Sequence, residues 1–255
     1  MKISIITATY NCRDTLSDCL DSVTKQSHVS VEHVLNDGAS SDGTLELLQR
    51  YRDGPQGAVV LTSESDQGIY DALNKGLARA TGEVIGLLHG DDALADDGVL
   101  DAVNEAFTDP TVQAVYGDLE YVAQDNTDEV IRYWRAGPFD PANLRRGWMP
   151  PHPTLFLRRS VYDRFGFFDT SYLIAADYDF MLRVLKHLTP EQVVYIPSVF
   201  TRMRVGGTSN RSIANIARKS CEDYRALRSN GIGGVGSLLF KNARKLPQFW
   251  QRSSS

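Results

Sequence analysis

The chain has 255 residues, an apolar fraction of 42% and a formal net charge of −5, which is typical of a globular protein with one large domain or a domain and an appendage. Its three cysteines lack CxxC spacing, so a disulfide framework and a structural zinc site are both disfavoured. No apolar run approaches the roughly 20 residues that span a bilayer, and the chain starts with a strand pattern rather than a signal peptide. We therefore expect a cytoplasmic protein.

The charges are distributed unevenly along the chain. Residues 1–201 contain 16 Lys and Arg against 30 Asp and Glu, whereas residues 202–255 contain 11 against 2. The acidic body argues against broad nucleic-acid binding. The basic tail has three candidate partners, which are anionic lipid, a phosphate-bearing ligand and the acidic body itself, and packing on the body is the simplest of them.

The first 94 residues alternate between short apolar runs and segments with helical periodicity. Strands are predicted over residues 2–8, 31–35, 58–62 and 83–88, with a helix after each of the first three. Apolar runs without polar alternation are typical of a parallel sheet that helices cover on both faces. Right-handed crossovers would then place the carboxyl ends of all four strands at one edge.

Acidic residues follow three of these strands. Asp37 and Asp66 lie in glycine-containing loops, and Asp91 and Asp92 follow the fourth strand directly. A single Asp–Asp pair is more often a solvated turn, but acid and glycine recur at three strand ends, where parallel sheets bind ligands. Because neither G-x-G-x-x-G nor G-x-x-x-x-G-K-[ST] occurs, the pattern favours a nucleotide site in which a metal holds the phosphates.

The rest of the chain is predicted to continue as mixed α/β structure. A helix is expected over residues 99–107, strands over 113–122, 130–134, 154–157 and 193–204, and a Pro/Gly-rich loop with one helical turn over 136–153. Asp177 and Asp179 open a helix over 175–185, where acids serve in capping slightly more often than in catalysis. Residues 212–250 read as two helices separated by a glycine-rich segment.

Six segments together resemble the inverting, nucleotide-sugar-dependent glycosyltransferases of family 2, which have the GT-A fold. The likeness is to bacterial polysaccharide and glycolipid enzymes of the colanic-acid type. In chain order the segments are Ile5–Asn11, Asn36–Thr44, Asp66–Gly76, Asp91–Asp92, His152–Phe156 and Ala176–Asp179. The resemblance implies a Rossmann-like, mostly parallel sheet flanked by helices over residues 1–209. Residues 1–94 would form its nucleotide-sugar half and 95–209 its acceptor half, and 210–255 would be a basic helical appendage.

The resemblance also implies roles for individual residues. Asp177 would be the catalytic base, and a Mn²⁺ or Mg²⁺ ion would bind Asp92, with Asp91 turned toward the donor sugar or ribose. The nucleotide-sugar pocket would be formed by Thr9, Tyr10, Asn11, Asp37, Asp66, Gly68 and Asp91. His152 and Arg204 would lie on the acceptor side.

Two positions depart from the family pattern. Ala8 stands where the family usually has Pro. Arg204 stands near the position at which many members of the family have a His. An arginine there could clamp the diphosphate by charge-assisted hydrogen bonds. His152 has an equally good interpretation as a histidine that is hydrogen-bonded within a Pro-flanked turn.

The expected activity, on this resemblance, is transfer of a sugar from a UDP-, GDP- or dTDP-sugar to a saccharide or lipid-linked saccharide in cell-surface polysaccharide or glycolipid biosynthesis. Two alternatives remain. A sugar nucleotidyltransferase would carry a Gly-rich, Arg- or Lys-bearing loop after the first strand, which is absent here. A catalytically silent nucleotide-sugar-binding subunit would not need to retain Asp91, Asp92 and Asp177.

The tail could also contact the inner face of the membrane. Its apolar residues near one helical face are Leu239, Ala243, Leu246 and Trp250, and its cations toward other faces are Lys241, Arg244 and Lys245. The same stripe could pack on the acidic body instead, and Pro247 interrupts the helix. Both arrangements stay open at this point.

Overall fold

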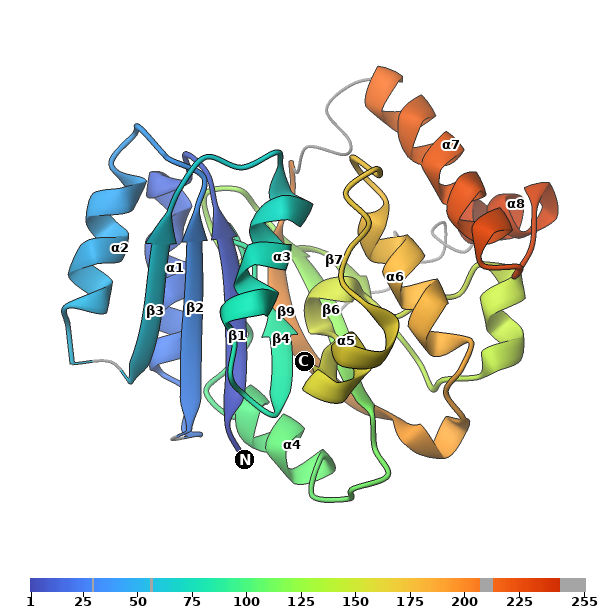
Figure 1. Cartoon of the computed structure of the whole chain (residues 1–255), viewed down its shortest axis with the longest axis horizontal. Helices are drawn as coiled ribbons and strands as arrows, with labels where there is room; N and C mark the ends of the chain where they lie inside the picture. The colour runs from blue at the N-terminus through green and yellow to red at the C-terminus, as the bar shows by residue number, and fades with distance from the viewer. Residues whose placement is uncertain (29, 56, 207–212, 244–255) are drawn as a thin grey trace.

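Figure 1 shows the computed structural model of the chain, which describes residues 1–28, 30–55, 57–206 and 213–243. In these ranges one nine-stranded sheet has the order β3-β2-β1-β4-β8-β6-β9-β5, and β7 pairs with β6 beside this path. Helices cover both faces of the sheet. The architecture is therefore the α/β class that the strand and helix pattern predicts.

Four parallel strands form the first half of the sheet. They are β1 (Ile3–Thr9), β2 (Val31–Asp37), β3 (Ala58–Ser63) and β4 (Val84–Leu87). Their connections are α1 (Arg13–Thr24), α2 (Thr44–Arg52) and α3 (Ile69–Arg79). The register sets Thr9 beside Asp37 and Asp37 beside Ser63, so the carboxyl ends of these strands meet at one edge. β2 runs two residues further than the sequence predicts and includes Asp37.

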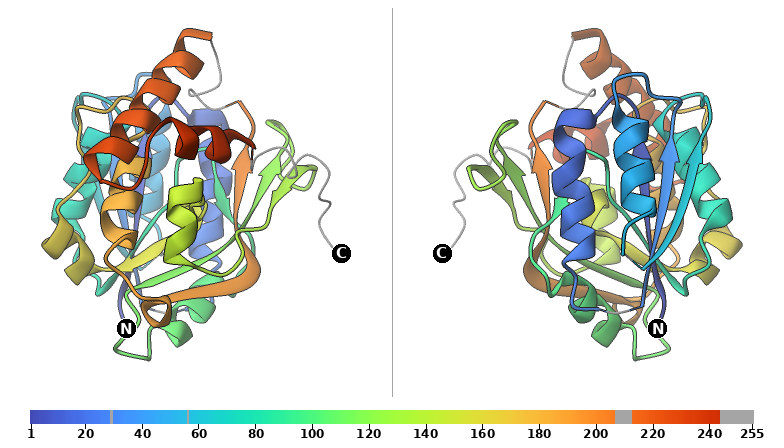
Figure 2. Two further views of the ribbon diagram at one scale, coloured as in Figure 1. Left: turned by 90° about the vertical axis from the view of Figure 1, so that its right-hand side faces the viewer. Right: turned by 90° about the vertical axis from the view of Figure 1, so that its left-hand side faces the viewer.

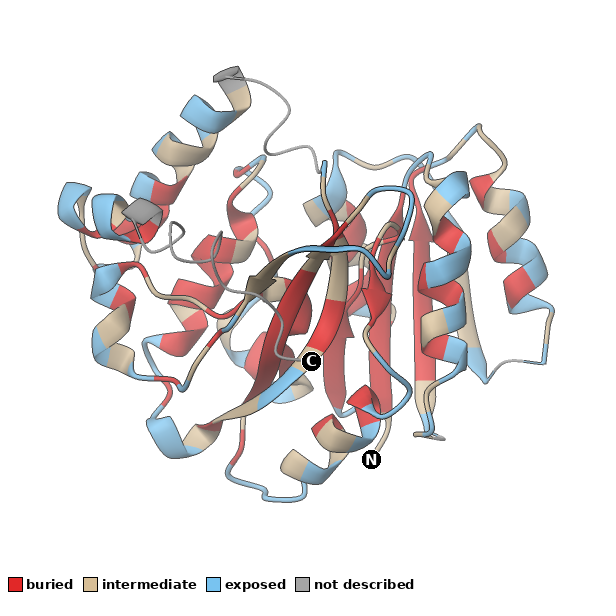
Figure 3. Ribbon diagram, turned by 180° about the vertical axis from the view of Figure 1, so that it is seen from behind, coloured by how far each residue is buried: buried red, intermediate tan, exposed pale blue. Residues whose placement is uncertain are grey.

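Alternating side chains hold a helical layer on each face. Ile6 and Val34 point to the face covered by α3, α5 (Arg159–Phe165) and α6 (Ala176–Leu185). Ile5 and Leu35 point to the opposite face, which α1, α2 and α4 (Val99–Ala106) cover. Figure 3 shows the buried strands between helices whose outer surfaces are exposed. Each fully buried aliphatic side chain contributes about 1.5–3 kcal/mol to this packing.

The second half of the sheet mixes strand directions. β8 (Phe156–Arg158) is antiparallel to β4 and to β6 (Ala114–Val122), whereas β6 and β9 (Val193–Arg204) are parallel. The two short antiparallel partners are β5 (Ala93–Leu94), which pairs with β9, and β7 (Val130–Trp134), which pairs with β6. Gly86 leaves room for the Phe156 ring of its pairing partner in β8, because a Cβ at this position would stand 2.3 Å from that ring.

Short elements account for the differences from the predicted pattern. The described connections include the 3-10 helices η1 (Pro141–Arg146), η2 (His152–Thr154) and η3 (Pro190–Gln192). η1 lies where one helical turn is predicted. The sequence pattern misses α5 and β5, because seven and two residues are too few to show a period.

Two C-terminal helices pack beside α6 (Figures 1 and 2). They are α7 (Ile213–Ser229) and α8 (Val235–Ala243). Ala226, Leu227 and Ile232 join the same apolar cluster as α6. Lys241 pairs with Asp223 at 2.7 Å, and both side chains are buried. The described part of the basic tail therefore packs on the body through one of its faces.

Part of the tail lies outside the described residues. This applies to the expected boundary at residue 209 and to Arg244, Lys245, Leu246, Pro247 and Trp250. None of the helices in the described ranges combines the length and apolar character needed to cross a membrane.

His33 is a buried histidine of β2 that stays neutral in the folded protein. Its ring nitrogens lie 2.9 Å from Thr7 Oγ1 and 3.0 Å from the Tyr51 hydroxyl oxygen. Burial lowers the pKa of His33 to about 3. In the unfolded chain this pKa is about 6.5, so between the two values the unfolded state binds more protons and stability falls as the pH falls.

We expect His33→Gln to reduce the acid sensitivity of the fold. One such group adds up to about 1.4 kcal/mol per pH unit to the slope of the unfolding free energy against pH. Between about pH 6 and pH 4.5, the slope of the variant should therefore be smaller than that of the parent protein by about this amount. Urea denaturation across this range measures both slopes. Equal slopes would show that His33 already binds a proton in the folded state.

Candidate active site

The carboxyl ends of β1, β2 and β3 are joined through Asp37. Its buried carboxylate accepts hydrogen bonds from the Ser40 amide at 3.0 Å, the Ser63 hydroxyl at 2.7 Å and the Thr9 hydroxyl at 3.3 Å. Asn11 joins the same loops, since its Oδ1 accepts the Ser41 N–H at 2.9 Å. Asp37, Thr9 and Asn11 are thus brought together, and the two carboxylate oxygens of Asp37 are already bonded within the protein.

Tyr10, Asp66 and Gly68 lie on the outer side of this edge. A Cβ built on Gly38 would stand 3.2 Å from the Tyr10 ring and 2.6 Å from Asp66 Oδ2, so Gly38 separates the two side chains. Asp66 Oδ1 accepts the Gly68 N–H at 2.8 Å. The Tyr10 ring is 67% exposed, which leaves an aromatic face open for stacking.

The acid pair follows β4 on a loop that touches the end of β1. A Cβ on Gly90 would stand 3.1 Å from Thr9 Cγ2. Asp91 is half-buried, whereas Asp92 is 1% exposed. Asp92 Oδ1 accepts the Arg204 N–H at 3.3 Å, and Oδ2 is buried without a partner among the described residues. Burial first, and the neighbouring Asp91 carboxylate second, raise the pKa of Asp92.

Arg204 lies beside the acid pair, and its guanidinium is only 5% exposed. It donates to the Asp91 carbonyl at 2.8 Å and to the Gln124 carbonyl at 2.9 Å, and it pairs with Asp18 of α1. Each of its three side-chain nitrogens thus donates to a protein oxygen, one of them in the acid loop. The guanidinium therefore stabilises the acid loop.

A chain of close polar contacts leads from the acid loop to Asp177. His89 Nε2 lies 3.2 Å from His152 Nε2, and His152 Nδ1 lies 3.1 Å from Asp177 Oδ2. The Tyr70 hydroxyl lies 3.1 Å from Asp177 Oδ1. These contacts place Asp177, at the start of α6, on the same edge of the sheet as Asp91.

The protonation states along this chain follow from burial and charge. Burial lowers the pKa of His152 to about 4, so the ring is neutral near pH 7. Burial acts to raise the pKa of Asp177, but His152, which carries a proton in the acidic range where Asp177 titrates, and Lys241 outweigh it and the pKa is lowered. A neutral His152 that donates a hydrogen bond from Nδ1–H to the Asp177 carboxylate must accept one at Nε2. His89 then donates from Nε2, which agrees with its buried Nδ1 having no partner among the described residues.

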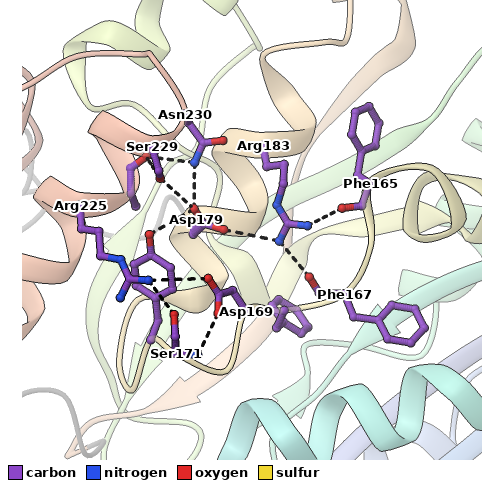
Figure 4. Close-up of polar contacts among 12 residues, drawn as sticks. Phe165, Phe167, Asp169, Ser171, Asp179, Arg183, Arg225, Ser229 and Asn230 are labelled. Carbon is purple, nitrogen blue, oxygen red and sulfur yellow. Dashed lines mark hydrogen bonds and ion pairs between the residues drawn. The ribbon is translucent and has the colours of Figure 1, made fainter.

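Asp179 points away from Asp177, as the helical spacing predicts. Figure 4 shows its carboxylate between α6 and α7, where it lies 3.5 Å from Arg183 and accepts the Asn230 amide at 2.9 Å. A hollow of about 370 Å³ opens beside it. Its acids and arginines are largely paired with one another, so we place the candidate site at the sheet edge instead.

Two site residues are not singled out by the sequence. Tyr70 belongs to the Asp66–Gly76 segment, and His89 precedes the acid pair by two residues. His89 directly follows the predicted strand over residues 83–88, and this position marks it as a candidate site residue. Its contact with His152, 63 residues away, was not visible in any local pattern.

Solved structures share this fold. TarS 1–349 of S. aureus in complex with UDP-GlcNAc matches with a TM-score of 0.70 at 17% identity, over 91% of this chain and 66% of that one. Mannosyltransferase PcManGT from Pyrobaculum calidifontis in complex with GDP-Man and Mn²⁺ matches with a TM-score of 0.69 at 22% identity, over 98% and 73%. The chain covers 39% of the longer S. aureus TarS structure. The fold is that of the GT-A glycosyltransferases.

Sequence similarity identifies the family. The family model described as Glycosyl transferase family 2 matches residues 4–168. A PGL/p-HBAD biosynthesis glycosyltransferase of Mycobacterium bovis (strain BCG / Pasteur 1173P2) is 33% identical over 183 residues, which are 71% of this chain and 68% of the relative. The chain belongs to glycosyl transferase family 2 and is a glycosyltransferase. The family and fold expected from the six sequence segments are confirmed.

Proposed function

We propose that this glycosyltransferase moves a sugar, with inversion, from a nucleoside-diphosphate-sugar to a hydroxyl of a saccharide or lipid-linked saccharide in bacterial cell-surface polysaccharide or glycolipid biosynthesis. One observation carries the proposal. The ionised Asp177 carboxylate is connected through His152 and His89 to the loop of Asp91 and Asp92. A proton acceptor and an acid pair suited to a metal diphosphate thus share one edge of the sheet. The donors named for the related structures, UDP-GlcNAc and GDP-Man, support the donor class.

In this proposal Asp177 is the general base. It takes the proton of the acceptor hydroxyl while that oxygen forms a bond to the anomeric carbon, and the bond from this carbon to the diphosphate oxygen breaks. A single displacement of this kind inverts the anomeric centre. His152 and Tyr70 contact the two oxygens of Asp177 and fix the direction in which the carboxylate faces.

The acid pair fits a divalent cation such as Mn²⁺ or Mg²⁺, which prefers oxygen ligands. Among the described residues, Asp92 Oδ2 has no hydrogen-bond partner and the Asp91 carboxylate accepts no hydrogen bond. No three His, Cys, Asp or Glu side chains of the described ranges come together as a metal site, so the donor diphosphate would complete the coordination. A bound divalent ion would neutralise charge that develops on the leaving diphosphate.

The sequence expectation placed the metal on Asp92, but burial favours Asp91. Asp92 is 1% exposed and also accepts the Arg204 amide, whereas Asp91 is half-buried. We therefore propose Asp91 as the direct ligand and Asp92 as its buried support.

Substitution of each carboxylate separates these roles. We expect Asp91→Asn to abolish the increase in affinity for UDP or GDP that Mn²⁺ produces, and Asp92→Asn to retain it, because asparagine keeps the oxygen that accepts the Arg204 amide. Isothermal titration with and without Mn²⁺ measures both. If only Asp92→Asn lost the Mn²⁺-dependent increase in affinity, Asp92 would be the metal ligand, as the family resemblance implies. If both variants kept the increase, the ion would bind elsewhere.

Asp177→Asn should lower the transfer rate by about 10² to 10⁴ and leave donor affinity nearly unchanged, because it keeps the shape and removes the proton acceptor. Asp179→Asn is the matched control on the same helix, and it should keep the rate once folding is verified. A near-normal rate in Asp177→Asn, or a folded but inactive Asp179→Asn, would contradict the assignment of the base.

The activity itself is tested by a turnover panel. UDP-, GDP- and dTDP-sugars are incubated with Mn²⁺ or Mg²⁺ and saccharide acceptors, and released nucleoside diphosphate is measured. Release that requires an acceptor supports the proposal. Binding of a donor without turnover, seen as a raised melting temperature alone, would favour the silent binding subunit.

A cytoplasmic location with peripheral membrane contact is part of the proposal. The outer face of α8 exposes Val235, Leu239 and Phe240, whereas Ser237 and Lys241 are buried against the body. An exposed apolar face on a basic segment is typical of interfacial helices.

We expect the full-length protein to float with vesicles that contain anionic lipid and not with neutral ones. Leu239→Ser together with Phe240→Ser should weaken this binding, since each change removes apolar area from the lipid contact. Flotation that is absent for the parent protein, or unchanged in the double variant, would assign α8 a packing role only.

A further inference from the structure

We infer that Glu222 of α7 is a positioning residue for Asp177, because its carboxylate holds the segment from which α6 begins. The inference rests on the proposed role of Asp177. Glu222 Oε1 accepts the Leu173 N–H at 3.1 Å, and Oε2 accepts the N–H groups of Ile174 at 2.8 Å and Ala175 at 2.9 Å. Three consecutive backbone donors thus converge on one side chain.

The start of α6 needs an acceptor from outside the helix. The N-cap and first-turn N–H groups of a helix have no partner within it; Glu222 accepts the one of Ala175, the N-cap of α6, and those of the two residues before it. A carboxylate provides charge-assisted hydrogen bonds and complements the positive end of the helix dipole. α7 supplies this carboxylate from 47 residues further along the chain.

Tyr70 holds the same segment from α3. Its hydroxyl lies 2.7 Å from the Ile174 carbonyl oxygen and 3.1 Å from Asp177 Oδ1. The backbone around Ile174 is therefore fixed at its N–H by Glu222 and at its C=O by Tyr70. A shift of this segment changes the position of Asp177, three residues on.

Other contacts attach α7 to the body without Glu222. Arg225 donates to the Ser171 hydroxyl at 2.7 Å, and Asn230 donates to Asp179, as Figure 4 shows. Lys186, at the far end of α6, donates to the Asn230 carbonyl at 3.1 Å. Loss of the Glu222 carboxylate should therefore leave α7 in place and free only the segment before Asp177.

The experiment compares Glu222→Gln with Lys186→Met. Glutamine keeps the size of the side chain but has a single acceptor oxygen, so at least one of the three amides loses its partner. Lys186→Met loosens the other end of the contact between α6 and α7 and leaves residues 173–175 untouched. Hydrogen exchange by mass spectrometry follows the amides of residues 173–175. Initial rates with UDP-GlcNAc and GDP-mannose give kcat and KM.

We expect faster exchange at residues 173–175 in Glu222→Gln only. Its kcat should fall by about 10-fold to 100-fold, the scale of a small displacement of a catalytic group, while KM for the donor stays close to that of the parent protein. A purely structural role would instead leave kcat per folded molecule unchanged.

Three outcomes overturn the inference. They are unchanged exchange in Glu222→Gln, an unchanged kcat, and an equal loss of kcat in Lys186→Met. If the parent protein turns over neither donor, the proposed function fails for these donors. Exchange at residues 173–175 then decides separately whether Glu222 holds the segment.

Discussion

Parallel pairing of β1 with β2 on one side and with β4 on the other decides where the acids of this protein lie. Because the three strands run in one direction, each must end at the same edge, and each ends in a polar loop. Asp37 is drawn into the hydrogen bonds that hold the edge together, whereas Asp91 keeps its carboxylate clear of described donors. The same topology therefore gives one acid a structural part and leaves another available to a ligand.

Helix α6 shows how two acids of one turn come to differ. Asp177 and Asp179 are separated by about 200° around the helix axis at 3.6 residues per turn, so they face different surroundings. Asp177 meets His152 and Tyr70, and Asp179 meets Arg183 and Asn230. The pKa of Asp177 is lowered despite burial, by His152 in the acidic range and by Lys241, so its carboxylate is ionised near pH 7, which is the state a proton acceptor requires. The helix thus presents a buried, ionised carboxylate beside His152 and Tyr70 on one side and holds α7 on the other.

Much of the fold was predictable from the sequence, because strands, helices and their order leave local patterns of apolar residues. Asp37, Asp91 and Asp177 were predictable for a related reason, since each stands beside the break in such a pattern. The positions of Arg204 and Glu222 were not predictable, because their partners are 112 and 47 residues away and no periodicity connects them. Burial of Asp92 beneath Asp91 was equally hidden, since adjacent residues look alike in a sequence and differ only once packed.

The bond between Arg204 and Asp18 joins the end of β9 to α1 across 186 residues, and Arg204 also reaches Asp91 across 113. A ribosome that adds about 5–20 residues per second therefore synthesises the acid loop roughly 6 to 23 seconds before Arg204, which contacts it. During this interval the chain already contains β1 to β4 but lacks the arginine that contacts the loop of its acid pair. The contacts that Arg204 makes with the acid loop and with α1 can therefore form only after β9 has been synthesised.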